Sequence, residues 1–139
     1  MIEEEKPPKN SWDVKLIAGG LVDIEFIAQY LSLMAPLRGF DASERNANTA
    51  ATLKRLGPAS MAPADLDTVL EALQLYSDIA QVIRLCIDGP FDPDDAPEGL
   101  KELLCRISEV PDLAVLEGEV RRYSQAVRGI FDRLVGKPT

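Results

Sequence analysis

GGLVDIEFIAQYLSL, residues 19–33, opens with two glycines and continues as an apolar run that few polar side chains interrupt. Apolar residues crowd positions 21 to 34, between Gly20 and Pro36, and this run is too long for an ordinary strand. It therefore predicts a helix over 21–34 that is buried on nearly all sides.

Helical spacing of apolar residues continues along the rest of the chain. We expect a second helix over 43–56, with Ser43 as its N-cap and Gly57 and Pro58 as its stop. A third helix, the longest and most central, is expected over 63–87. The segment DGPFDPDDAPEG, residues 88–99, is rich in turn-forming residues and predicts a loop. A short helix over 97–107 and a long one over 113–135 complete the pattern.

These elements predict an all-α fold, an antiparallel helical bundle of four to five helices. We expect residues 12–136 to form a single helical domain, with 1–11 as a linker or frayed end and 137–139 as a tail. The predicted buried set lies on apolar stripes at helical spacing: Phe26, Leu70, Leu73, Ile83, Leu116, Ile130 and Phe131.

Composition excludes several classes of function. Of the 139 residues, 46% are hydrophobic, enough for one core without metals or disulfides. A net charge of -8 argues against nucleic acid or anionic membranes as partners and favours a protein. The absence of histidine removes His-based triads, His metal sites and the usual near-neutral base.

Both cysteines, Cys86 and Cys105, lie in apolar helical patterns and predict buried thiols in a reducing cytosol. The chain has no apolar run of membrane-spanning length and no signal-peptide pattern at its start. We therefore expect a soluble, cytoplasmic protein.

Candidate functional residues gather around the double glycine. Gly19 and Gly20 precede a helix N-terminus, where Lys15 could reinforce a phosphate site, although a plain tight turn explains the glycines equally well. Asp23 suits the first helical turn, and on a helix it points away from Glu25, so the two carboxylates do not converge on a metal unless the helix starts late. Glu25 and Gln29, four residues apart, share one face and could pair with each other or meet an adjacent domain.

The stretch WDVKLIAGGLVDIEFIAQYL, residues 12–31, resembles a signature of glutamine synthetase adenylyltransferase, the bacterial bifunctional adenylylating and deadenylylating enzyme. The family pattern reads approximately aromatic-D-[IV]-K, a spacer, G-G-[IL]-x-D-I-E-F and Q-[YF]-L. PII uridylyltransferases carry a shorter version without the I-E-F continuation. The stretches NTAATLKRL, residues 48–56, and VRGIFDRLVG, residues 127–136, also fit such a helical domain.

The resemblance implies a helical domain that follows a nucleotidyltransferase domain. Val22-Asp23 stands where the deadenylylating half of the family usually has R-E, which favours the C-terminal, adenylylating half. The implied parent transfers AMP from ATP, with Mg²⁺, to a tyrosine of glutamine synthetase. Implied partners are its own nucleotidyltransferase domain, glutamine synthetase and the PII signal protein. Lys15, Gly19, Gly20, Asp23, Glu25 and Gln29 would face the nucleotide or the catalytic domain, and Gly20→Val would then impair transfer more than folding.

The catalytic core of that superfamily is missing from the sequence. It requires a G-S turn for the triphosphate and a D-x-D pair for the metal, whereas the D-x-D here, Asp65-Leu66-Asp67, falls in a predicted helix without a preceding G-S. We therefore expect a fragment or accessory domain, inactive in isolation, with no catalytic residue, metal or cofactor of its own. A stand-alone helical interaction module is the rival interpretation.

Overall fold

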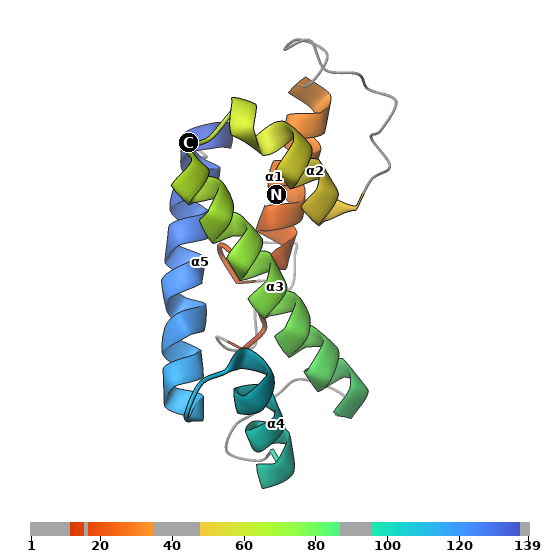
Figure 1. Cartoon of the computed structure of the whole chain (residues 1–139), viewed down its shortest axis with the longest axis vertical. Coiled ribbons are helices and arrows are strands. Elements are labelled where there is room, and N and C mark those ends of the chain that lie inside the picture. The colour runs from red at the N-terminus through yellow and green to blue at the C-terminus, as the bar shows by residue number, and fades with distance from the viewer. Residues whose placement is uncertain (1–11, 16, 35–47, 87–95, 137–139) are drawn as a thin grey trace, which may run out of the picture.

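The computed structural model describes residues 12–15, 17–34, 48–86 and 96–136, and these ranges contain helices and no strand (Figure 1). The helices are α1 (Leu21–Met34), α2 (Thr49–Leu56), α3 (Pro63–Cys86), α4 (Glu98–Ser108) and α5 (Leu113–Val135), with the short 3₁₀ turn η4 (Gly57–Ala59) after α2. The predicted all-α bundle is confirmed.

Helix α3 is the longest element and the centre of the bundle. It packs against α5, which runs in the opposite direction, and against α4 near its C-terminal end (Figure 1). Helices α1 and α2 pair with each other, and α1 also contacts α5 and α3. One ion pair and one hydrogen bond at the surface link α5 to α3. The Arg133 guanidinium lies 2.8 Å from the Asp65 carboxylate, and the Tyr123 hydroxyl donates to Glu71 at 2.9 Å.

Local sequence explains where the helices begin and end. The side chain of Asn48 accepts a hydrogen bond from the Ala51 N–H, and Asp112 does the same for Val115, so each caps a helix N-terminus. Helix α2 thus begins six residues later than predicted, while Ser43, the expected cap, lies outside the described residues. The predicted bounds of α1 and α5 are confirmed, and those of α3 and α4 differ by one residue.

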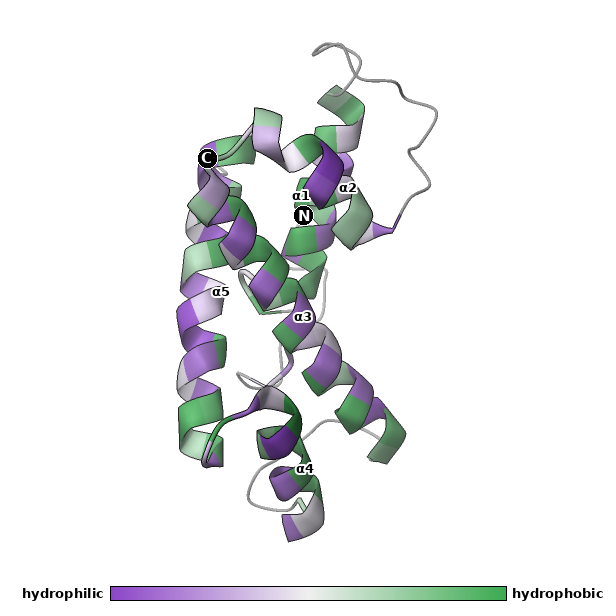
Figure 2. Cartoon of the chain, in the orientation of Figure 1, coloured by the Kyte–Doolittle hydropathy of each residue, from purple (hydrophilic) through white to green (hydrophobic). Residues whose placement is uncertain are grey.

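The core is formed by one apolar side of each helix (Figure 2). Leu116 and Ile130 are buried as predicted, whereas Leu70, Leu73, Ile83 and Phe131 are only half-buried against the core. The prediction that Phe26 belongs to the core is wrong, because 47% of this residue is exposed. Helix α1 is therefore not buried on nearly all sides: its core side carries Ile24, Ile27, Ala28 and Leu31, and its outer side faces solvent.

The prediction of two buried thiols is also corrected. Cys86 is exposed at the C-terminal end of α3, and Cys105 is half-buried on α4. Burial raises the pKa of the Cys105 thiol, with a smaller contribution from Asp112. None of the described helices is long and apolar enough to cross a membrane.

Candidate functional site

The segment before α1 folds back on the first turn of that helix. The N–H of Gly20 donates to the Ile17 carbonyl at 2.9 Å, that of Leu21 to Val14 at 2.8 Å, and that of Val22 to Lys15 at 3.1 Å. These backbone donors are the groups that a helix N-terminus would offer to an anion. Since the chain's own carbonyls already use them, this N-terminus is a closed turn.

Both glycines are required by close backbone contacts. Gly19 has a φ of +78°, and a Cβ at this position would overlap the carbonyl oxygen of Ser124 on α5. A Cβ at Gly20 would overlap the carbonyl oxygen of Val14 within the turn. The expectation that Gly20→Val impairs transfer more than folding is therefore corrected, because a side chain at this position would destabilise the turn itself.

Asp23 joins the turn to the last helix. One of its carboxylate oxygens accepts a hydrogen bond from the Gly19 N–H at 2.6 Å and lies 3.1 Å from the Arg128 guanidinium. Arg128 also lies 3.4 Å from Asp132 and stacks over the Phe131 ring at 4.6 Å. Phe131 in turn contacts Phe26, with ring centroids 5.5 Å apart. Asp23 thus has a definite structural task, the docking of α1 on α5.

We expect Asp23→Asn to lower the free energy of unfolding by about 1–2 kcal/mol, because the half-buried Arg128 loses the nearer of its two carboxylate partners. Glu25→Gln, the same chemical change at an exposed position of the same helix, is the matched control and should alter it by less than about 0.5 kcal/mol. Urea unfolding of both variants measures the difference. Equal effects would show that the Asp23 to Arg128 pair does not stabilise the fold.

A buried hydroxyl lies close to this junction. Tyr76, on α3, is fully buried, and its hydroxyl has no hydrogen-bond partner among the described residues. Burial raises the pKa of the Tyr76 phenol above its usual range, with smaller contributions from Asp23 and Tyr123. The phenol therefore stays protonated and contributes mainly through the packing of its ring.

Tyr76→Phe should leave the free energy of unfolding unchanged or raise it by about 1 kcal/mol, since it removes a buried polar group that lacks a partner. Tyr76→Ala, which removes the ring as well, should lower it by about 3–5 kcal/mol. Thermal unfolding monitored by circular dichroism compares the two. A clear loss in the phenylalanine variant would reveal a hydrogen bond made by this hydroxyl.

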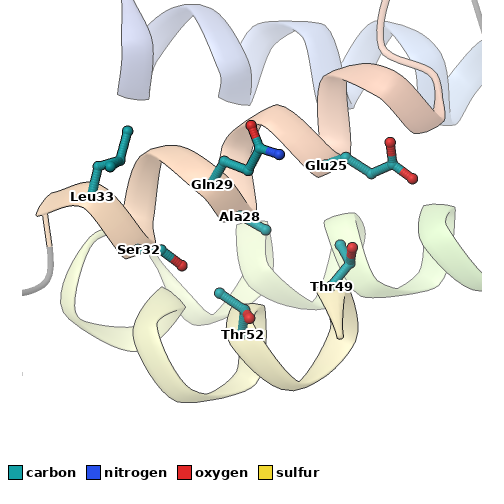
Figure 3. Close-up of a pocket in the computed structure, with 7 residues that line it drawn as sticks. All are labelled: Glu25, Ala28, Gln29, Ser32, Leu33, Thr49 and Thr52. Atoms are coloured by element: carbon teal, nitrogen blue, oxygen red, sulfur yellow. The ribbon is translucent and has the colours of Figure 1, made fainter. Parts of the chain in front are cut away.

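The remaining members of the predicted site face outward. Lys15, Glu25 and Gln29 are exposed, whereas Gly19 and Gly20 are buried and Asp23 is half-buried. Glu25 and Gln29 line an open groove of about 380 Å³ between α1 and α2, and their side chains lie on its rim (Figure 3). The structure thus divides the six predicted residues into an internal group and an external one.

Hydroxyl groups that the sequence did not single out complete the groove. Its described lining adds Ser32 from α1 and Thr49 and Thr52 from α2, together with Ala28 and Leu33. Ser32 lies seven residues after Glu25 and three after Gln29, a helical spacing that could have indicated the shared face. The threonines come from another helix, and Arg128 lies 105 positions from Asp23, so no local pattern could have found them.

The described residues do not fit a nucleotide with its metal. The backbone donors before α1 are used within the turn, and no three His, Cys, Asp or Glu side chains in the described ranges converge as metal ligands. In this part of the chain, the arrangement suits contact with another protein surface better than phosphate binding.

Comparison with known proteins identifies relatives along almost the full length of the chain. The chain is 55% identical over 135 residues to the bifunctional glutamine synthetase adenylyltransferase/adenylyl-removing enzyme of Rhizobium meliloti, 51% over 135 residues to that of Agrobacterium fabrum, and 39% over 136 residues to that of Brucella suis. These matches cover 97–98% of the chain but 14% of each relative. No protein-family model and no solved structure matches significantly.

The family resemblance drawn from residues 12–31 is thereby confirmed over nearly the whole chain, which is similar to one fragment of the bifunctional glutamine synthetase adenylyltransferase/adenylyl-removing enzyme.

Proposed function

We propose that this chain is a helical domain of an enzyme that adenylylates and deadenylylates a tyrosine of glutamine synthetase. The observation that carries the proposal is the match of 97% of the chain, at 55% identity, to an enzyme of that name. The chain spans 14% of that relative, and its described residues contain no cluster of metal ligands; we therefore place the ATP and Mg²⁺ of the reaction elsewhere in the enzyme. The adenylyltransferase relatives favour this function over that of a PII uridylyltransferase or a stand-alone interaction module.

We place the domain after the nucleotidyltransferase domain of the C-terminal, adenylylating half. Val22-Asp23, in place of the R-E typical of the other half, supports this position. In the structure, Asp23 accepts a hydrogen bond from the Gly19 N–H and lies 3.1 Å from the Arg128 guanidinium. In the cytoplasm, glutamine synthetase would be the substrate of this enzyme, and the PII signal protein a further partner.

The six site residues act in two ways under this proposal. Gly19, Gly20 and Asp23 hold the start of α1 against α5, as their contacts indicate. Lys15, Glu25 and Gln29 are exposed beside them and would face the catalytic domain. The internal group therefore fixes the position from which the external group makes contact.

Domain replacement tests the proposed function. In a chimaera, this chain takes the place of the matching 135 residues of the Rhizobium meliloti enzyme. We expect the chimaera to transfer labelled AMP from ATP to glutamine synthetase, and the chain alone to transfer none. A folded chimaera without transfer would contradict the proposal, and so would transfer by the isolated chain.

Lys15→Ala in this chimaera should reduce adenylyl transfer by about tenfold without lowering the melting temperature, because Lys15 is exposed and free to contact another domain. Lys54→Ala, which removes another exposed lysine, on α2, is the control and should leave the rate unchanged. If the two variants transfer AMP equally well, Lys15 has no part in the reaction.

A further inference from the structure

Helix α1 exposes an apolar stripe that a peripheral helix of an isolated domain does not need. Val22, Phe26 and Leu33 are 36%, 47% and 72% exposed, and their spacing of four and seven residues places them along one side of the helix. Exposed apolar side chains that lie together mark an interaction surface more often than a free one. The opposite side of α1 is already occupied by the core.

The groove between α1 and α2 continues this stripe as a polar surface. Leu33 belongs to both, and beside it the groove presents Glu25, Gln29 and hydroxyls (Figure 3). Among its described lining residues, Glu25 is the sole charged group. The surface therefore combines an apolar half with a polar half of amide and hydroxyl groups that carries one negative charge.

We propose that this surface, formed by Val22, Phe26, Leu33 and the α1/α2 groove, docks a protein segment that bears a lysine or arginine beside apolar side chains. A basic side chain is the complement of this surface, because Glu25 is the one charged residue in the described lining of the groove. A small molecule seated in the groove would leave the apolar stripe uncovered, so a polypeptide fits better.

The occupant is part of the same enzyme, and this assignment rests on the function proposed above. The relatives extend far beyond the segment that this chain matches, so each contains ample polypeptide to cover the surface. Charge also favours such a contact over pairing of two copies, because this chain carries a net charge of -8 and the groove is itself acidic.

Photocrosslinking in the chimaera tests the docking. Leu33 is replaced by the photoreactive residue p-benzoylphenylalanine, and mass spectrometry maps the products. We expect an intramolecular crosslink to one segment outside this chain that contains a lysine or arginine. Glu25→Lys should lower its yield by about tenfold, because like charges then meet at the groove. Leu85, on α3 and 73% exposed, offers a matched position whose crosslinks should not respond to Glu25→Lys.

The outcomes separate docking from function. No crosslink from position 33, a crosslink only to a second copy, a target without a basic residue, or a yield that ignores Glu25→Lys would each overturn the docking proposal. Adenylyl transfer by the same chimaera is assayed separately. Transfer without the crosslink refutes docking alone, and the crosslink without transfer refutes the proposed function alone.

Discussion

Gly19→Ala is expected to lower the free energy of unfolding by about 2–4 kcal/mol. Two costs combine in this estimate: a φ of +78° strains any residue with a side chain, and the added methyl group would overlap the backbone of Ser124. Backbone atoms cannot move aside as a flexible side chain can, so α1 and α5 would have to separate. Urea unfolding at equilibrium provides the measurement.

Gly118→Ala supplies the matched control for this prediction. Gly118 lies inside α5, and a Cβ at this position would meet nothing within 4 Å. Alanine is the better helix former, so this variant should gain about 0.5–1 kcal/mol. Similar changes in the two variants would mean that the contact between Gly19 and Ser124 is looser than the structure shows.

Ile24→Ala should lower the free energy of unfolding by about 2–5 kcal/mol, whereas Phe26→Ala should cost only about 1 kcal/mol. Ile24 is fully buried, and its truncation leaves a cavity in the core. Phe26→Ala removes more atoms, but Phe26 is half-exposed, so the variant loses mainly the contact with Phe131. Thermal or urea unfolding of both variants provides the ranking.

The reverse ranking would place the outer side of α1 in the core and would also remove the basis of the proposed docking surface. A third variant, Leu33→Ser, serves as a control for general loss of apolar surface. Leu33 is 72% exposed, so its replacement should change stability by less than about 0.5 kcal/mol.

Periodicity located the long helices well because their ends carry local determinants. Helix α5 begins after the capping Asp112 and ends before Gly136, and both are visible in the sequence. The predicted start of α2 was wrong because Ser43 and Asn48 are both good N-cap residues, and tertiary context decides between such residues.

Sidedness was predictable only where polar residues mark the solvent side. Helix α5 has such residues, whereas the outer side of α1 mixes polar residues with exposed apolar ones, so its apolar spacing did not separate Ile24 from Phe26. The role of the double glycine was left open for a similar reason. Gly19 is explained by Ser124, which lies more than a hundred positions away on another helix, and Gly20 by the carbonyl of Val14 within the turn.

The ion pair between Asp23 and Arg128 also has a consequence for folding during synthesis. Its two residues are separated by 105 positions, and a ribosome that adds about 5–20 residues per second needs about 5 to 20 seconds to cover that distance. During this interval α1 can pair with α2 and α3, but its site on α5 does not yet exist. Native structure in this domain therefore arrives late, when the last helix leaves the ribosome and closes against the first.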